Sequence, residues 1–390
     1  MNDLVSELIT LIRSIYGEGT IPLHRPIFTP NDEKKLAECL RSNFVSTAGN
    51  ELIEFESLTA SYTQRKYAIS TVNGTAALHL ALMAVGADAS CEVITQPLTF
   101  VATANAISYT GAVPVFVDIG RDTLGLCPTK LRNWLHKNCI SQNGATINKT
   151  TGRKIIAVLP MHTFGIPYQE GEISDVCREF GIFHISDAAE ALGTFDKNGK
   201  HAGYTADLSV ISYNGNKVIT TGGGGMVCTD REDFFFKIKN LSTTAKKPHL
   251  FEFEHTEVGY NYRMPNINAV LGLSQMNILH QILSSKKQIS KMYRDFFQRR
   301  GVEFLPVASA LQNEWLNGFY CNDIAQRDNF LQRLNDSYIQ CRAAWKLMPD
   351  LEMYKHLETD GLENATDIQS RIINLPSSAV FSLDQKFINV

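Results

Sequence analysis

Short apolar segments alternate with longer helical patterns between about residues 66 and 230. Most of these segments are apolar at both odd and even positions, as strands are when helices cover both faces of their sheet. Residues 75–86 and 99–111 lie between such segments and carry helical patterns that each end at a glycine. This alternation predicts right-handed crossovers and a mainly parallel sheet. We expect its strands at residues 67–72, 92–96, 113–119, 154–160, 183–187, 208–213 and 225–229.

The pattern changes after about residue 245, where a polar stretch precedes one long helical pattern at residues 266–301. Shorter mixed elements follow, and residues 148–154 within the first region form a polar hairpin or loop. We therefore predict a large α/β domain at residues 31–245 and a smaller α+β domain at residues 246–390. Before them, residues 1–30 are expected to form an amphipathic helix and an arm, because apolar residues recur there at helical spacing: Leu4, Leu8, Leu11, Ile12 and Ile15.

Composition and charge exclude several classes of protein. The 390 residues are 44% hydrophobic and 20% charged, with a net charge of −3, which is ordinary for a globular protein and offers no footprint for nucleic acid. No run approaches the roughly 18 apolar residues of a membrane span, and the N-terminus lacks the basic start of a signal peptide. The eight cysteines form no CxxC pair, so we expect reduced thiols in the cytoplasm, with no disulfide framework and no metal site.

Lys217 lies between an expected strand and the four consecutive glycines of Gly222–Gly225. A phosphate-binding P-loop needs glycines before the lysine and a hydroxyl directly after it, but Val218 follows here and the glycines come later. The glycine run also lacks G-x-G-x-x-G spacing and precedes a strand, which excludes a dinucleotide fingerprint. The stretch is either a plain turn or a lysine held close to a cofactor. We expect positive φ angles at Gly222–Gly225 if the chain turns tightly there.

Four other segments each allow a functional and a structural interpretation. Gly74 and Thr75 begin a helix directly after a strand, which favours either an anion site or an ordinary capped turn. Asp187 ends an expected strand, where it either contacts a ligand or caps a helix. Phe100 either stacks on a flat ring or belongs to the core, and His162 is either catalytic or a satisfied loop histidine.

These features are more specific together than separately. A helix N-terminus, an aromatic residue, a carboxylate at a strand end and a lysine about thirty residues later follow one another along the chain. Pyridoxal 5'-phosphate (PLP) needs an anion cradle, a ring stacker, a carboxylate that keeps its ring nitrogen protonated and a Schiff-base lysine. The combination therefore predicts a PLP site.

Five motifs carry a resemblance to a known family: NGTAALHLAL, TFVATANAI, DAAEALG, SYNGNK with TGGGG, and GYNYRMPNINAVLG. They occur in family order, and similarity extends from residues 22–28 to residues 372–378. The chain resembles the DegT/DnrJ/StrS family of sugar aminotransferases. The resemblance implies an α/β fold of the fold-type-I PLP-dependent transferase (aspartate aminotransferase-like) class.

The resemblance also implies a role for each matched residue. Lys217 would form the Schiff base and move the proton, and Asp187 would pair with the pyridinium nitrogen. Glu190 would lie near the 3-hydroxyl of the ring, although many relatives have glutamine at this position. Four further positions would bind the cofactor: Gly74, Thr75 and Ser212 at its phosphate and Phe100 against its ring.

Asn261 would reach the phosphate in the partner subunit, so the resemblance implies a homodimer with shared active sites. Two basic pairs, His24 with Arg25 and Lys246 with Lys247, either contact the nucleotide sugar or are solvated basic residues.

The implied reaction is transamination between L-glutamate and a nucleotide-linked 4-keto-6-deoxy hexose in surface-polysaccharide amino sugar biosynthesis. Several phrases resemble the bacillosamine and legionaminic branch, which implies a UDP-linked, N-acetylated substrate and pyridoxamine phosphate between the half-reactions. Amination at C3 of the sugar and a non-catalytic regulator that retains the fold remain alternatives. Related dehydratases have histidine in place of the Schiff-base lysine, and Lys217 argues against that activity.

Overall fold

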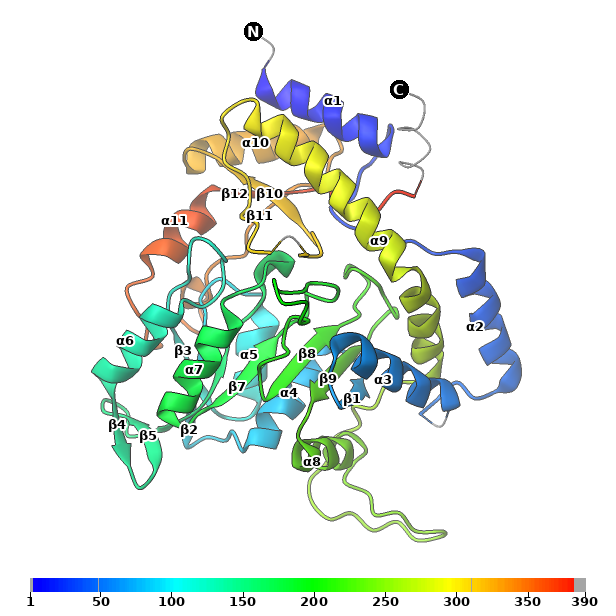
Figure 1. Cartoon of the computed structure of the whole chain (residues 1–390), viewed down its shortest axis with the longest axis vertical. Coiled ribbons are helices and arrows are strands. Elements are labelled where there is room, and N and C mark those ends of the chain that lie inside the picture. Colours follow the sequence, from blue (N-terminus) through cyan, green and yellow to red (C-terminus); the bar gives the residue numbers. More distant parts are fainter. Residues whose placement is uncertain (1–2, 48, 310, 382–390) are drawn as a thin grey trace.

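The computed structural model describes residues 3–47, 49–309 and 311–381. A mixed sheet lies at its centre, with strand order β1–β9–β8–β7–β6–β2–β3 (Figure 1). Along this order the strands are parallel to their neighbours except β9, which runs antiparallel to both β1 and β8. The strands are β1 (Tyr67–Thr71), β2 (Cys91–Thr95), β3 (Val113–Phe116), β6 (Lys154–Leu159), β7 (Phe183–Asp187), β8 (Leu208–Ser212) and β9 (Gly225–Thr229).

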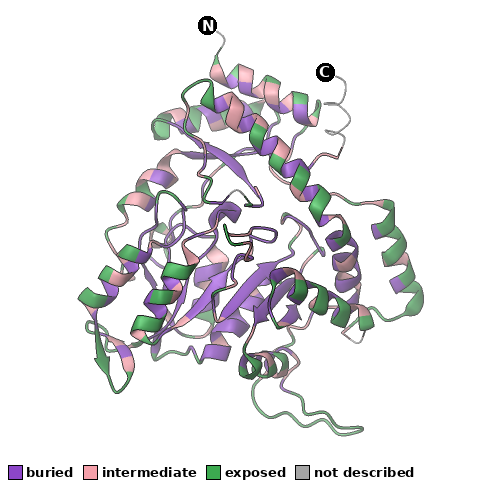
Figure 2. Ribbon diagram, viewed as in Figure 1, coloured by how far each residue is buried: buried purple, intermediate pink, exposed green. Residues whose placement is uncertain are grey.

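Helices cover both faces of this sheet, which explains why its strands are apolar at both odd and even positions. One face packs against α4 (Gly74–Val85), α5 (Val101–Tyr109) and α8 (Glu232–Ser242). The opposite face packs against α3 (Asn50–Thr63), α6 (Pro128–Asn138) and α7 (Glu170–Phe180). Figure 2 shows the strands almost entirely buried between helices that are exposed on their outer sides.

The 33-residue helix α9 (Asn266–Gln298) connects this layer to the remaining elements. Its first part packs against α2 (Pro30–Ser42) and α3, and its last part against the amphipathic helix α1 (Leu4–Tyr16). Beside it lie a small antiparallel sheet and two helices (Figure 1). These elements are β10 (Asn317–Tyr320), α10 (Ile324–Asp336), β11 (Arg342–Ala343), α11 (Glu363–Arg371) and β12 (Ile372–Leu375).

The seven predicted strands and four predicted helices are all present, with ends that differ by a few residues. Among the strands, the largest difference is at residues 113–119, where the strand ends at Phe116. The predicted loop at residues 148–154 is the turn between two antiparallel strands. A hairpin of β4 (Cys139–Gln142) and β5 (Ala145–Asn148) was not predicted, because its strands are short and β4 is largely exposed. The division into domains at residue 245 stays a proposal.

The described ranges contain no helix that is long and apolar enough to cross a membrane. In the same ranges, no group of three or more His, Cys, Asp and Glu side chains is placed to hold a metal ion.

One buried carboxylate joins the small sheet region to the large sheet. Asp118 follows β3 and is fully buried. Its two oxygens accept hydrogen bonds of 2.9 Å from the backbone N–H groups of Asn364 and Ala365, in the first turn of α11. Lys130 of α6 donates a further hydrogen bond of 2.7 Å. Because the first N–H groups of a helix have no partner within it, this carboxylate fixes α11 against the sheet.

We expect Asp118→Asn to lower the free energy of unfolding by about 3 kcal/mol, because an amide places donors against the donors of α11 and Lys130. Urea denaturation measures this change. The exposed Asp122 offers a matched control, and Asp122→Asn should change stability by less than about 0.5 kcal/mol. Equal stabilities of the two variants would contradict this account of the contact.

Candidate active site

A cavity of about 310 Å³ opens where the carboxyl ends of β7 and β8 meet the N-terminal ends of α4 and α5. Open α/β sheets bind ligands at this edge of the strands. Seven of the eight residues that the sequence analysis assigned to the cofactor lie in its wall. They are Gly74, Thr75, Phe100, Asp187, Glu190, Ser212 and Lys217.

The N-terminus of α4 forms one end of the cavity. Asn73 caps this helix, its Oδ1 accepting a hydrogen bond of 2.8 Å from the backbone N–H of Ala76. The N–H groups of Gly74 and Thr75 are the first of the helix and have no partner inside it, so they are available to an anion in the cavity. Ser212 adds a hydroxyl beside them, since a Cβ placed on Gly74 would lie 3.0 Å from Cβ of Ser212.

The glycine run at Gly222–Gly225 lies beside this end of the cavity, but its backbone conformation differs from the predicted one. Only Gly222 has a positive φ, of 81°, so the prediction of positive φ at Gly222–Gly225 was wrong for the other three. Gly225 is required for another reason, because a Cβ there would lie 2.6 Å from the carbonyl of Asn73. The start of β9 therefore passes directly against the loop that begins α4.

Lys217 lies in the loop between β8 and β9, and its side chain is only 12% exposed. Its Nζ donates a hydrogen bond of 3.1 Å to Oε1 of Glu190 and lies 4.3 Å from the centre of the Trp315 ring. The other carboxylate oxygen of Glu190 accepts a hydrogen bond of 2.9 Å from the backbone N–H of Phe164. Burial raises the pKa of Glu190 to about 7, against the opposing effect of the nearby lysine.

Asp187 ends β7 and is buried on the floor of the cavity. Oδ2 accepts a hydrogen bond of 2.8 Å from Oγ1 of Thr103, and Oδ1 accepts one of 3.1 Å from the backbone N–H of Ala189. Burial raises the pKa of this carboxyl, while the two donors and Lys217 act in the opposite direction. A cationic ring nitrogen in the cavity would supply the positive counter-charge that this buried carboxylate lacks.

The chain matches the family model of the DegT/DnrJ/EryC1/StrS aminotransferase family over residues 26–387. It belongs to this family.

The alignments with named relatives cover most of the chain. A GDP-perosamine synthase of Escherichia coli O157:H7 is 32% identical over 365 residues, which are 94% of this chain and 95% of the relative. The solved structure of Helicobacter pylori PseC, an aminotransferase involved in the biosynthesis of pseudoaminic acid, has a TM-score of 0.82. It is 25% identical, and the match covers 92% of this chain and 94% of PseC. DesI, solved with its TDP-sugar product, has a TM-score of 0.80 at 25% identity, covering 93% and 90% of the two chains.

Membership of the family makes this protein a PLP-dependent sugar aminotransferase of nucleotide-sugar amino sugar biosynthesis, with the predicted fold type I. Structures of the same fold exist in a PLP form and a PMP form. The cavity of this chain fits such a cofactor by its own chemistry, because it has an anion cradle at one end, a buried carboxylate on its floor and a lysine amine in its wall.

Several other predicted positions lie outside the cavity wall of this aminotransferase. Asn261 is exposed in the segment after α8, where it pairs with Thr243 through the backbone. His162 is fully buried, with its ring stacked 4.2 Å from that of Tyr168, so it is a core histidine that supports the strand of Asp187. Arg25 is exposed, and its backbone N–H donates to Ser378.

Lys246 and Lys247 lie on the loop that projects beyond α8 at the bottom of Figure 1. Lys246 contacts the ring of Phe253, and Lys247 donates to Glu254. In this single chain neither lysine lines the cavity.

Two tryptophans that the sequence analysis missed complete the wall. Trp315 precedes β10 and Trp345 follows β11, so both come from the C-terminal part of the chain. Trp345 contacts the rings of Phe100 and Phe164 with centroid distances of 6.0 and 5.1 Å. Their sequence surroundings, QNEWLNG and RAAWKLM, follow no motif, so nothing in the sequence indicated that these tryptophans line a cavity.

The buried carboxyl of Glu190 predicts a pH-dependent effect on stability. Its pKa of about 7 in the folded chain exceeds its ordinary value near 4.3, so the folded state binds more protons between these values and loses stability as the pH rises. Glu190→Gln removes this dependence. Going from pH 5 to pH 8, the stability of Glu190→Gln should therefore rise relative to wild type, by on the order of 3 kcal/mol.

Denaturant melts of the cofactor-free proteins at both pH values measure this difference. Glu33→Gln changes an exposed carboxylate on α2 and should show no such relative rise. A constant difference between Glu190→Gln and wild type at pH 5 and pH 8 would refute the assignment.

Proposed function

We propose that this aminotransferase transfers the amino group of L-glutamate to the keto carbon of a nucleotide-linked 4-keto-6-deoxy hexose. A UDP-linked, N-acetylated sugar is our first candidate for the substrate. The observation that carries the proposal is the single cavity in which the amine of Lys217, the carboxylate of Asp187 and the α4 N-terminus face one another. One relative is named for a GDP sugar, and the solved structure of DesI holds a TDP-sugar product. The nucleotide of the substrate is therefore the part of the proposal that most needs a test.

PLP, when bound, withdraws electrons from the reacting carbon of each substrate and stores the amino group between the two half-reactions. Lys217 is the residue that bonds to it and that moves the proton with its Nζ. Glu190 holds this nitrogen in place at 3.1 Å and is the adjacent group able to take up a proton near neutral pH.

Asp187 would keep the ring nitrogen of bound PLP protonated, since a buried carboxylate stabilises a neighbouring cation far more than water does. Thr103 and the backbone N–H of Ala189 orient this carboxylate toward the cavity. The first N–H groups of α4 and the hydroxyl of Ser212 would hold the phosphate, and Phe100, which is 46% exposed in the cavity wall, would stack on the ring.

The active enzyme in this proposal is a homodimer. Asn261 is exposed and lies outside the cavity of its own chain, which supports the proposal that it serves the cavity of a second copy. Its loop also exposes large apolar side chains that a second copy would cover: Leu250, Phe251, Phe253 and Val258.

The substrate proposal is tested with L-glutamate and a panel of UDP-, GDP- and dTDP-linked 4-keto-6-deoxy sugars. We expect glutamate-dependent formation of a 4-amino sugar from at least one UDP-linked, N-acetylated member of the panel. Mass spectrometry detects the amino product, and NMR locates its amino group. Lys217→Ala should abolish this product, whereas Lys197→Ala, which changes an exposed lysine, should not. An amino group at C3, or turnover of GDP or dTDP sugars alone, would contradict the proposed substrate.

Shared active sites are tested by mixing two inactive variants. Lys217→Ala and Asn261→Ala should each be impaired as homodimers, whereas a mixed dimer combines one intact lysine with one intact asparagine in the same site. Complementation should restore up to about one quarter of wild-type activity after co-expression, since half of the dimers are mixed and each holds one intact site. A mixture no more active than the separate variants, in dimers proven to be mixed by differential tags, would rule out sharing through Asn261.

A further inference from the structure

A second lysine lies behind the cavity and takes no part in the chemistry above. Lys286, on α9, is fully buried. Its Nζ donates hydrogen bonds to the carbonyl oxygens of Trp315 and Ser377, at 3.0 and 2.5 Å, and lies 3.0 Å from Nε2 of His24. Lysine is almost never buried completely unless its amine has partners, so this position requires a reason.

The three partners of Lys286 come from three separate segments of the chain. His24 belongs to the N-terminal arm, Trp315 to the segment before β10, and Ser377 to the segment after β12. As an ammonium the nitrogen donates to all three, and as a neutral amine it donates to the two carbonyls and accepts from His24. Burial lowers the pKa of Lys286 to about 7, so both forms are within reach near neutral pH and both satisfy every contact.

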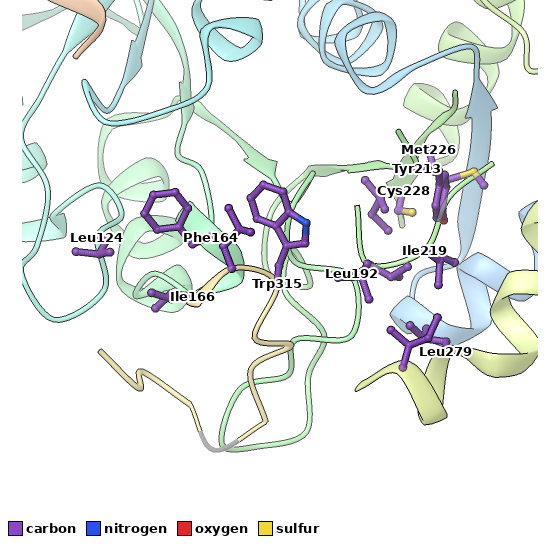
Figure 3. Close-up of a cluster of buried hydrophobic side chains, with 14 of the residues drawn as sticks. Leu124, Phe164, Ile166, Leu192, Tyr213, Ile219, Met226, Cys228, Leu279 and Trp315 are labelled. Carbon is purple, nitrogen blue, oxygen red and sulfur yellow. The ribbon is translucent and has the colours of Figure 1, made fainter. Parts of the chain in front are cut away.

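Trp315 connects this group of residues to the active-site lysine. Its indole N–H donates a hydrogen bond of 2.8 Å to the carbonyl of Asn216, the residue before Lys217. Its ring lies in the cavity wall, 4.3 Å from Nζ of Lys217, and Figure 3 shows it within the buried cluster that also contains Phe164 and Leu192. His24 contacts the same ring from behind, at a centroid distance of 6.4 Å.

We propose that Lys286 is a positioning residue that fixes the backbone of Trp315 and so holds the indole ring over Nζ of Lys217. An aromatic face at this distance stabilises the ammonium form of an amine and keeps water from it. Lys286 thereby sets how reactive the amine of Lys217 is, although the two side chains do not touch. The inference rests on the proposed function only in taking Lys217 as the reactive amine.

The test uses the cofactor-free full-length protein, with Lys217 labelled by a trace of acetic anhydride at pH 8 and its modification measured by peptide mass spectrometry. Lys286→Met should increase the labelling rate of Lys217 by roughly two- to fivefold, because the ammonium form of the amine loses the stabilisation that the aromatic face provides. Lys291→Met is the matched control, because Lys291 lies on the same helix and is exposed, and it should leave the rate unchanged. Labelling of the exposed Lys197 in every sample reports any general loosening and should stay constant.

A double variant tests whether Lys286 acts on Lys217 through Trp315. Trp315→Leu alone should raise the labelling of Lys217 by a similar factor, and adding Lys286→Met to it should give no further increase. Unchanged labelling in folded Lys286→Met, or full additivity in the double variant, would overturn the proposal.

If Lys286→Met does not melt cooperatively, His24→Ala takes its place, since it removes one of the three partners and leaves the lysine. We then expect a smaller increase at Lys217, and an unchanged rate overturns the proposal. No cofactor or sugar is present, so this result stands apart from any failure of the substrate panel.

Discussion

The contact of 3.1 Å between the amine of Lys217 and the carboxylate of Glu190 is the interaction on which the site depends. The carboxylate of Glu190 is buried and the side chain of Lys217 is only 12% exposed, and burying either charge alone would cost several kcal/mol. The surroundings are arranged to keep this pair in place. The backbone N–H of Phe164 holds the second oxygen of Glu190, and Phe164 adopts a φ of 58°, a conformation that bulky residues rarely have. Asn313 fixes the backbone carbonyl of Glu190 from the C-terminal part of the chain.

The parallel sheet brings this pair to the other groups that the chemistry needs. Asp187 and Ser212 end neighbouring strands, and the close approach of Gly225 to Asn73 sets the start of α4 beside them. The fixed strand spacing thus places an anion cradle, a carboxylate and an amine in one cavity without any long-range adjustment. The C-terminal part closes the cavity through Trp315 and Trp345. Asp118 holds α11 against the sheet, and Lys286 holds the segment of Trp315 against α9, both through buried hydrogen bonds.

The strands and most of the cavity residues could be predicted from the sequence, because they depend on the local pattern of apolar and polar residues. Strands buried on both faces are apolar at odd and even positions alike. Asp187 ends β7 and Lys217 lies in the loop after the parallel strand β8, so both side chains are expected at the same edge of the sheet. Trp315, Trp345 and Lys286 could not be predicted, since their positions depend on how distant segments pack together. The φ angles of the glycine run were mispredicted because residues distant in sequence contact it, Asn73 at Gly225 and Asn268 at the carbonyl of Gly223. Asn261 lies outside the cavity of the single chain, so its role depends on a second copy.

Amino transfer through Lys217 in this cavity is measured by a single half-reaction without any sugar. PLP-loaded enzyme is mixed with L-glutamate, and the cofactor spectrum and 2-oxoglutarate are followed together. We expect complete conversion from the PLP form to the PMP form with one 2-oxoglutarate per active site, and no conversion in Lys217→Ala. An unchanged cofactor spectrum with glutamate, or equal conversion in Lys217→Ala, would contradict amino transfer through Lys217.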